Sequence, residues 1–346
     1  MSDHLLTVDD LRVAFRTEDG LVQAVDGVSF HVDAGEVLAI VGESGCGKSV
    51  TGMTLLGLTR GPNARFGGRA VFDGCELVGA SDEQLRRIRG AAIAMVFQDP
   101  MTALNPVQRI GKQIAEQILA HTELDEDAAI ERARALLERV GIPRPAERLR
   151  AFPHELSGGM RQRVMIAMAL SCDPRLLIAD EPTTALDVTI QAQILEEVRQ
   201  LRAETGAGVI LITHDLGVVA DVADRVAVMY AGQLVEQGAL DEIFYDPQHP
   251  YTWGLLGSIT RVDRPRPARL PAIAGTPPSL ADPPQGCRFR PRCPHAFAHC
   301  TEQPPLEARE GSHPPHPDRC WLTPAEKREK RKVGGQIGLI GGELVA

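Results

Sequence analysis

The chain has 346 residues, 43% of them hydrophobic, and a formal net charge of −9 at pH 7. Its length allows one large domain or two, and its acidic balance disfavours a nucleic-acid-binding protein, which normally carries a basic field. The N-terminal stretch has no cationic segment followed by an apolar one, and no apolar run approaches the roughly 20 residues that span a bilayer. We therefore expect neither a signal peptide nor a membrane span, so that a role at a membrane requires a membrane partner.

The first sixty residues predict an antiparallel β layer, a buried strand and a helix. LRVAF from Leu11 and VSFHV from Val28 alternate apolar and polar residues, which is typical of antiparallel strands with one solvated face. VLAIVG from Val37 is continuously apolar, as in a parallel strand that is buried on both faces. A helical pattern follows over residues 48–58.

Helices alternate with buried strands through the middle of the chain. A Ser-x-x-Gln capping box at Ser81 predicts a helix start, and AIAMVFQ from Ala92 predicts a buried strand. Two further buried strands are predicted in LLIADE from Leu176 and VILIT from Val209, with a helix from about Val188 between them.

A helical block and a hairpin complete the predicted fold. Residues 109–140 have helical periodicity, and Gly141 is a suitable helix stop. These residues belong to a helical block, roughly 100 to 165, that interrupts the α/β pattern. RVAVMY and QLVEQG predict a hairpin around Ala231 and Gly232. The prediction is an α/β fold with a mostly parallel sheet, an antiparallel β layer and an inserted helical subdomain.

The octapeptide GESGCGKS at residues 42–49 matches the phosphate-binding loop pattern and lies between a buried strand and a helix. Gly45 and Gly47 allow consecutive N–H groups to point at phosphate oxygens, and the helix N-terminus adds positive potential. Lys48 is placed to reach the β and γ phosphates and Ser49 to ligate Mg²⁺, whereas the structural alternative is a glycine turn with a chance lysine. The candidate nucleotide ligands are Gly42, Glu43, Ser44, Gly45, Cys46, Gly47, Lys48, Ser49 and Val50.

Four polar residues follow the ends of predicted buried strands. Ligands of doubly wound sheets bind at these ends, so Asp180 is a candidate for holding Mg²⁺ and Glu181 for orienting or deprotonating the attacking water. His214 is a candidate for contact with the γ phosphate, and Gln98 for contact with Mg²⁺ or the water and as a joint that moves the helical block. The structural alternatives are a solvated acidic turn, a capped histidine and a polar loop residue.

The stretch LSGGMRQR from Leu156 predicts a second anion site. Ser157, Gly158, Gly159 and Met160 stand at a predicted helix start, where free N–H groups and the positive helix end attract anions without any lysine. Because the chain already has a complete phosphate loop, we expect this stretch to cap the γ phosphate of a nucleotide that a second chain holds.

These motifs, together with Ala185-Leu186-Asp187, occur in the order and context typical of ABC-transporter ATPase subunits, a family that the chain resembles over residues 5–260. The resemblance implies a P-loop ABC ATPase fold in which two subunits sandwich two ATP molecules head to tail. It implies that Ser157 serves the partner's nucleotide and that Asp187 lies in the D-loop. Met160 and Thr184 depart from the commonest family pattern, but neither change removes a phosphate ligand.

The family also has an aromatic residue near the first strand that stacks on adenine. Phe15 is the candidate for this role, and a side chain that packs into the core is the alternative.

The C-terminal third narrows the resemblance. NPVQRI near Asn105, QHPYTWGLL near Gln248 and AGTPPSLADPPQGCRFRPRCP from Ala274 are similar to the di- and oligopeptide importer ATPases, a group that includes nickel importers. The resemblance implies two transmembrane permease subunits, an extracytoplasmic solute-binding protein and a second, homologous ATPase, with no nucleic-acid partner. It places the chain peripherally on the cytoplasmic face of the cell membrane.

Four of the seven cysteines follow residue 286 in the spacing C-x₅-C-x₆-C-x₁₉-C. Four thiolates suit an iron–sulfur cluster or tetrahedral zinc, but the C-x-x-C pairs of common metal sites are missing, so inert thiols are an alternative. The resemblance to peptide importers favours a structural [4Fe-4S] cluster. The candidate ligands are Cys287, Cys293, Cys300 and Cys320, and zinc has His295, His299, His313 and His316 as substitutes.

The predicted organisation is an ATPase core at residues 1–259, a Pro-rich and Cys-rich extension at 260–325 and a flexible tail at 326–346. One rival is a soluble ABC ATPase of DNA repair or ribosome function. Chromosome-type members need a long coiled coil between their two halves, for which the spacing here is too short, and tandem soluble members have two phosphate loops, whereas this chain has one. A second rival is a regulatory nucleotide-binding module without turnover, which the presence of Glu181 disfavours.

Overall fold

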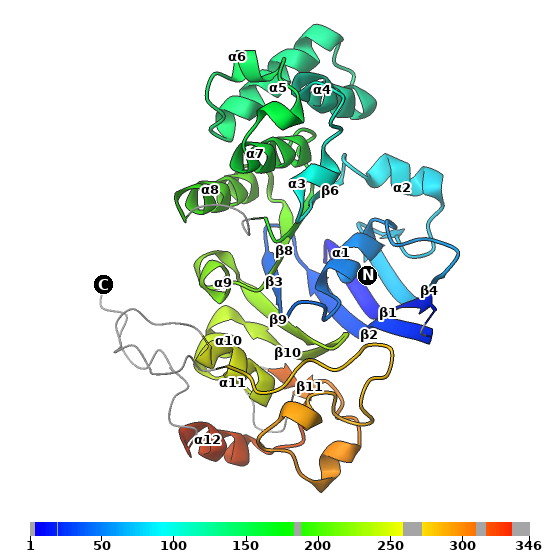
Figure 1. Cartoon of the computed structure of the whole chain (residues 1–346), viewed down its shortest axis with the longest axis vertical. Helices are drawn as coiled ribbons and strands as arrows, with labels where there is room; N and C mark the ends of the chain where they lie inside the picture. Colours follow the sequence, from blue (N-terminus) through cyan, green and yellow to red (C-terminus); the bar gives the residue numbers. More distant parts are fainter. Residues whose placement is uncertain (1–3, 19, 183–187, 259–271, 309–315, 334–346) are drawn as a thin grey trace.

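The computed structural model describes residues 4–18, 20–182, 188–258, 272–308 and 316–333. They form two sheets with helices around them (Figure 1). The smaller sheet is antiparallel and has the strand order β2-β1-β4-β5, which confirms the predicted antiparallel layer. Its strands are β1 (Leu6–Thr17), β2 (Gly20–Val32), β4 (Ala64–Phe72) and β5 (Cys75–Glu76).

The larger sheet contains the buried strands and has the order β11-β12-β10-β9-β3-β8-β7-β6. The five strands from β9 to β6 are parallel, as predicted, and three antiparallel strands complete one edge. The strands are β3 (Val37–Val41), β6 (Ile93–Val96), β7 (Leu176–Asp180), β8 (Gly208–Thr213), β9 (Arg225–Tyr230), β10 (Gln233–Ala239), β11 (Glu307–Ala308) and β12 (Pro317–Asp318).

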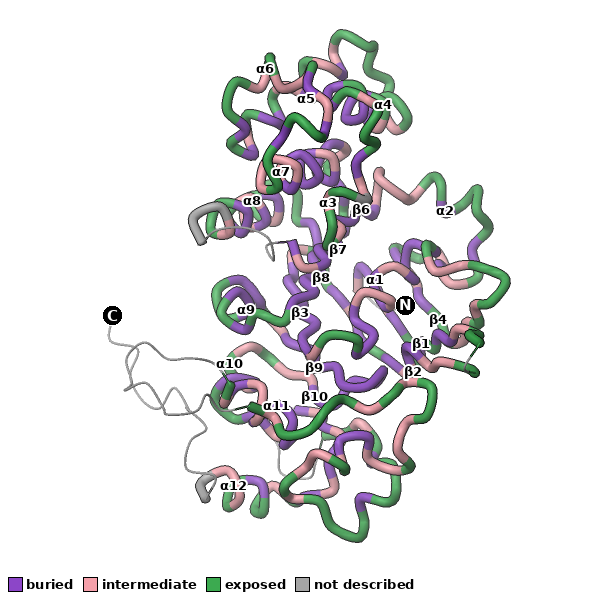
Figure 2. Tube along the Cα trace, in the orientation of Figure 1, coloured by how far each residue is buried: buried purple, intermediate pink, exposed green. Residues whose placement is uncertain are grey.

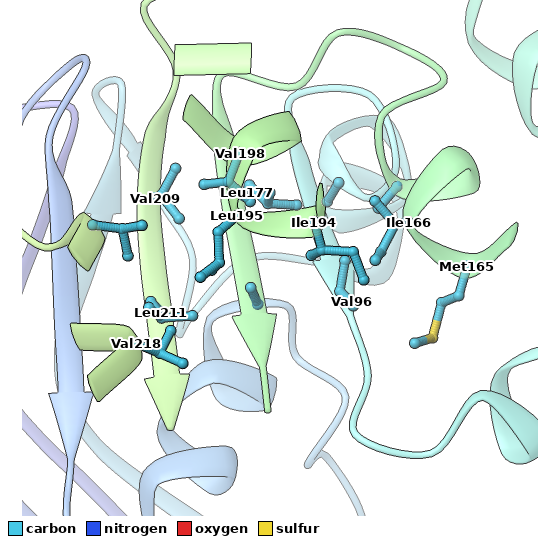
Figure 3. Close-up of a cluster of buried hydrophobic side chains, with 14 of the residues drawn as sticks. Val96, Met165, Ile166, Leu177, Ile194, Leu195, Val198, Val209, Leu211 and Val218 are labelled. Atoms are coloured by element: carbon cyan, nitrogen blue, oxygen red, sulfur yellow. The ribbon is translucent and has the colours of Figure 1, made fainter. Parts of the chain in front are cut away.

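Helices cover the central strands, so that β3, β7 and β8 are buried along their whole length (Figure 2). Figure 3 shows how strand side chains such as Leu177 and Leu211 lie near Leu195 of α8. Each apolar side chain that is removed from water in this way contributes about 1.5–3 kcal/mol to stability.

The first helices are α1 (Lys48–Leu55), α2 (Asp82–Ile88), α3 (Pro100–Ala103), α4 (Ile110–His121), α5 (Glu126–Arg139) and α6 (Pro145–Arg148). The later ones are α7 (Gly158–Ala169), α8 (Val188–Thr205), α9 (Leu216–Val222), α10 (Leu240–Tyr245), α11 (Pro250–Gly257) and α12 (Pro324–Val333).

The helical block lies at one end of the long axis of the molecule (Figure 1). The prediction of continuous helical periodicity over residues 109–140 is wrong in one respect, because α4 and α5 are separate helices. Asp125 accepts a hydrogen bond from the N–H of Ala128 at 2.8 Å and starts the second helix. Gly141 has a φ of 70°, as expected of a residue that ends a helix.

Two local predictions about helix and turn chemistry are confirmed. Ser81 and Gln84 form both hydrogen bonds of a capping box at the start of α2. Strands β9 and β10 form an antiparallel hairpin whose two turn residues, Ala231 and Gly232, have φ angles of 46° and 83°. Positive φ at both turn positions matches the right-handed twist of the flanking strands.

The C-terminal extension continues the main sheet. Strand β12 pairs with β10 through Asp318 and Glu236, and β11 pairs with β12. Residues 272–286, the first described part of the extension, have neither helix nor strand, and the carbonyl oxygen of Leu280 accepts a hydrogen bond from the N–H of Gln23 at 3.0 Å.

The predicted flexible tail at 326–346 starts too early. Residues 324–333 form α12, in which Lys327 is 2% exposed and pairs with Asp318 at 2.5 Å. Lys327 is therefore not part of a flexible, solvated tail, because β12 presents a buried carboxylate to it. Residues 334–346 lie outside the described residues.

Candidate functional site

The sheet brings the predicted polar residues to one edge. Strands β3, β8, β7 and β6 run parallel, so their carboxyl ends meet at the same side of the sheet. Asp180 is the last residue of β7, and the phosphate loop, His214, Glu181 and Gln98 follow the ends of these strands. Sequence positions that are more than a hundred residues apart are thus assembled into one site.

The loop between β3 and α1 depends on its glycines. Gly47 caps α1 with a φ of 104°, and a Cβ atom there would lie 2.3 Å from the carbonyl oxygen of Ala24. Gly45 has a φ of 78°, which side chains rarely adopt. The backbone can therefore turn its N–H groups inward, while Cys46 is 5% exposed and directs its side chain into the core.

Lys48 is 5% exposed and lies along the same loop. Its ammonium group donates hydrogen bonds to the carbonyl oxygens of Gly42 at 2.7 Å and Glu43 at 3.0 Å. A buried cation on a glycine-rich loop at the N-terminus of a helix is a suitable environment for the phosphates of a nucleotide.

Ser49 and Asp180 form the second part of the site. The Ser49 hydroxyl donates to a carboxylate oxygen of Asp180 at 3.0 Å. Asp180 is 4% exposed, and its burial raises the pKa of its carboxyl group above the usual value. Oxygen ligands of this kind suit Mg²⁺, which would favour the charged form of Asp180.

Glu181 stands at the centre of a third group. Its carboxylate accepts a hydrogen bond from the Gln98 amide at 3.0 Å and lies 3.1 Å from Nδ1 of His214. The residue has a φ of 47°, a strained conformation held by the bond from its N–H to the Ile212 carbonyl at 2.8 Å. Such strain costs on the order of 1–3 kcal/mol and is common at functional sites.

The LSGGMRQR stretch begins α7, as predicted. Ser157 caps the helix by accepting a hydrogen bond from the N–H of Met160 at 3.3 Å, and Ser157 and Gly158 are exposed. A Cβ atom at Gly158 would meet no atom of the described residues within 4 Å. The packing of these residues therefore does not explain the glycine at this position.

Sequence reasoning assigned no role to Gln162, one turn into α7. This side chain is 2% exposed and donates to the carbonyl oxygen of Pro182 at 2.8 Å. It connects the helix that starts at Ser157 with the segment that follows Glu181. The position of Gln162, three residues after Gly159, does not by itself predict this contact. Only the fold shows that α7 faces the end of β7.

Phe15 and Asp187 are the two site residues that only the family resemblance implies. Phe15 is partly buried near the end of β1 and packs against the core cluster between the two sheets, as the packing alternative also requires. The predicted D-loop residue Asp187, with Thr184, lies outside the described residues.

The four C-terminal cysteines line one small cavity, which Phe289 also borders. Burial raises the pKa of Cys293 to about 11 and that of Cys320 to about 12, so these thiols are protonated at neutral pH. Of the histidine substitutes, His295 borders this cavity, whereas His316 pairs with Glu236 at 2.8 Å. His299 stacks edge-on against Trp321, and His313 lies outside the described residues.

Among the described residues, only His4, His31 and Asp33 bring three metal-ligating atoms within 4.8 Å of one another. The guanidinium of Arg225 lies 3.0 Å from Nε2 of His31, and its positive charge opposes a metal ion there. No three of the four clustered cysteine sulfurs lie within that distance of one another.

An apolar groove of about 210 Å³ lies beside the helical block. Its lining includes Leu58, Met95, Phe97, Leu104, Met165 and Met168. The nearby side chains of Met101 and Val107 are 55% and 82% exposed. In the part of the chain that the structure describes, no helix combines the length and the apolar character needed to cross a bilayer.

Two family models match the chain: "ABC transporter" over residues 25–184 and "Oligopeptide/dipeptide transporter, C-terminal region" over residues 235–300. The oligopeptide transport ATP-binding protein OppD of Bacillus subtilis is 53% identical over 338 residues, which cover 95% of this chain and 94% of that protein. The dipeptide transport ATP-binding protein DppD of the same species is 54% identical, with 92% and 95% covered. OppD of Escherichia coli is 50% identical, with 88% and 90% covered.

Solved structures agree with the fold. The dimeric ATP-binding cassette MJ0796, bound to ADP and phosphate, matches with a TM-score of 0.62 and 25% identity over 68% of this chain and 98% of that one. CbiO1 of Clostridium perfringens matches with a TM-score of 0.58 and 31% identity, with 71% and 92% covered.

Proposed function

The chain belongs to the ABC transporter ATP-binding proteins, in the group of oligopeptide and dipeptide transport subunits, and on this premise we propose that it hydrolyses ATP to drive the import of di- and oligopeptides. The observation that carries the proposal is the convergence of the phosphate loop, Asp180 and Glu181 at one sheet edge. The peptide substrate is supported by the relatives, which are peptide transport proteins by name.

The residues of this site have distinct roles in the proposed reaction. Lys48 and the loop N–H groups hold the phosphates, and Ser49 with Asp180 would hold the Mg²⁺ that neutralises phosphate charge. Glu181 orients the attacking water and accepts its proton. Gln98 and His214 fix the two carboxylate oxygens of Glu181 by the contacts described above and flank the γ phosphate.

The complete site requires a second ATPase chain. Ser157, Gly158 and Gly159 would place the N-terminus of α7 against the γ phosphate that the partner holds. The exposure of this helix start, and the open space beside Gly158, support an approach from outside the chain. ATP then closes the dimer and hydrolysis reopens it, so that binding energy shifts the population of transporter states.

The partners are two permease subunits, a homologous ATPase chain and an extracytoplasmic solute-binding protein that acts through the permeases. The apolar groove beside Gln98 and the helical block is the proposed docking place for a cytoplasmic segment of a permease. The chain would then lie peripherally on the cytoplasmic face of the membrane, and motion around Gln98 would couple the nucleotide to the permease.

The cysteine-lined cavity is the proposed site of a [4Fe-4S] cluster, held by Cys287, Cys293, Cys300 and Cys320. Tetrahedral zinc with bonds of about 2.3 Å would hold its sulfurs about 3.8 Å apart, whereas no three of these sulfurs lie within 4.8 Å of one another. The cluster would supply metal–thiolate bonds that connect segments with few core contacts of their own, and its binding would release the thiol protons. Iron and acid-labile sulfide in equal amounts support the cluster; zinc in their place, or no metal, would refute it.

The experiment for the transport function measures ATP hydrolysis by the complex reconstituted with its permeases and binding protein. Peptides of increasing length and Ni²⁺ are added in turn. Stimulation by peptides supports the proposal and gives the length preference. Stimulation by Ni²⁺ alone would assign the alternative cargo, and no stimulation by peptides in an active complex would refute the proposed substrate.

A further inference from the structure

A guanidinium of the Cys-rich extension contacts the phosphate loop directly. Arg292 precedes Cys293 in the chain and donates two hydrogen bonds to the Glu43 carboxylate, at 2.5 and 3.0 Å. The Arg292 side chain is 4% exposed and that of Glu43 is 27% exposed. Two parallel, charge-assisted bonds fix both direction and distance, which a single flexible contact would not do.

The extension itself fixes the position of Arg292. Its guanidinium also donates to the carbonyl oxygens of Ala274 at 2.9 Å and Ile273 at 3.3 Å. It lies 5.8 Å from the centre of the Tyr230 ring and 3.4 Å from the Tyr230 hydroxyl. The carboxylate of Glu43 raises the pKa of Arg292, so that the cation persists at every physiological pH.

Glu43 is in turn a contact of Lys48. The Glu43 carbonyl oxygen accepts a hydrogen bond from the Lys48 ammonium at 3.0 Å, and the Glu43 N–H donates to the Tyr251 hydroxyl at 2.8 Å. Tyr251 is fully buried and its ring centre lies 5.4 Å from that of Phe289, which borders the cysteine-lined cavity. A shift of Glu43 therefore moves a carbonyl oxygen that positions Lys48.

A second arginine of the extension contacts a turn that is hydrogen-bonded to the loop. Arg288 follows Cys287, is 8% exposed and donates to the Ala231 carbonyl oxygen and the Asp26 carboxylate. The next residue of the same turn, Gly232, donates its N–H to the carbonyl oxygen of Cys46 in the phosphate loop at 2.9 Å. The Cys-rich segment thus contacts the loop directly through Arg292 and indirectly through Arg288 and the β9–β10 turn.

We propose that Arg292 is a positioning residue for ATP binding, which holds Glu43 and hence Lys48 in place, so that the Cys-rich extension sets the affinity of the phosphate loop for ATP. The proposal rests on the ATP-binding role proposed above for this loop. It requires no particular occupant of the cysteine-lined cavity. Because coupling between binding and conformation is reciprocal, bound ATP also stabilises the extension against opening.

The test measures the dissociation constant for Mg·ATP, by competition with a fluorescent ATP analogue, and the kinetic constants of the reconstituted complex. Arg292→Met is expected to weaken ATP binding about tenfold, a typical coupling between sites, and to raise KM by the same factor with kcat nearly unchanged. Arg292→Lys retains the positive charge but cannot donate two parallel hydrogen bonds to the carboxylate. Its affinity for ATP is expected to lie between those of Arg292→Met and the wild type. Arg328→Met, at an exposed position of α12, is the matched control and is expected to match the wild type.

A double-mutant cycle separates this role from a general loss of structure. If the two side chains act as a pair, Glu43→Gln combined with Arg292→Met is expected to weaken ATP binding little more than Arg292→Met alone. Additive losses, or unchanged ATP affinity in an Arg292→Met protein with a normal thermal unfolding transition, would overturn the proposal. A wild-type complex that binds no ATP, or a Lys48→Ala variant that binds it normally, would instead refute the proposed function.

Discussion

The replacement of Glu181 by glutamine tests the proposed chemistry most sharply, because it removes a charge and a proton acceptor with little change of shape. Neighbours of the carboxylate include Gln98 at 3.0 Å and His214 at 3.1 Å, and its side chain is 11% exposed. A glutamine there retains one acceptor oxygen but presents an amide to the other neighbour. The phosphate loop contacts of Lys48 do not involve Glu181.

The size of the effect follows from this environment. Loss of one preorganised catalytic polar group typically lowers turnover by roughly 10² to 10³, which corresponds to about 2.7–4 kcal/mol in activation free energy. ATP binding is expected to remain, since the phosphate and Mg²⁺ ligands are intact. Nucleotide should therefore accumulate unhydrolysed in the Glu181→Gln protein.

The assay combines single-turnover ATP hydrolysis with equilibrium ATP binding in the reconstituted complex. Glu83→Gln, which alters an exposed residue of α2 that pairs with Arg87, is the matched control and should hydrolyse ATP at the wild-type rate. Normal hydrolysis by Glu181→Gln would refute the role of this carboxylate, and loss of ATP binding would show that Glu181 acts as a ligand of the nucleotide.

The other predictions concern the second chain and the C-terminal extension. Ser157→Ala is expected to lower, by roughly 10²-fold, hydrolysis of the ATP held by the partner chain; photolabelling of each chain should show normal binding to its own loop, and loss of that binding would refute the head-to-tail arrangement. Lys327→Met removes the cation that pairs with the buried Asp318 and should lower the free energy of unfolding in urea by about 3–5 kcal/mol. Asp318→Leu, added to the same chain, should restore most of this loss. Unchanged stability of the single variant would contradict the buried pair. Burial alone would lower the pKa of His316, but the hydrogen bond and charge of Glu236 raise it. The pair of His316 with Glu236 thus stabilises the fold fully below a pH of about 6.5, and this stabilisation is lost as the pH rises through the raised pKa. The difference in Tm between wild type and His316→Gln should therefore shrink over this range. A constant difference would exclude the pair as its source.

Local patterns in the sequence determine much of the site. The strand at Val37, the glycines of the phosphate loop and the helix start at Ser157 each depend on neighbouring residues, and each prediction is confirmed. The convergence of Asp180 and Glu181 with the loop follows from one general rule, that the parallel strands of a sheet end at one edge.

Contacts between distant segments could not be predicted in the same way. Arg292 and Glu43 are 249 positions apart, and no periodicity relates them. The burial of Lys327 depends on Asp318 in a strand of two residues, which is too short to give an alternating pattern. The helical spacing of apolar residues continues across the break before Asp125, so periodicity alone does not reveal that break. The local signal for it is Asp125 itself, a residue type that favours the N-cap position of a helix.

ATP-dependent peptide uptake tests the central claim most directly. Proteoliposomes that contain the reconstituted complex with ATP enclosed would receive the solute-binding protein and a labelled peptide outside. Uptake is expected to require enclosed ATP and to fall with Glu181→Gln in proportion to hydrolysis. Uptake without ATP, or uptake that the Glu181→Gln complex sustains at the wild-type rate, would contradict it.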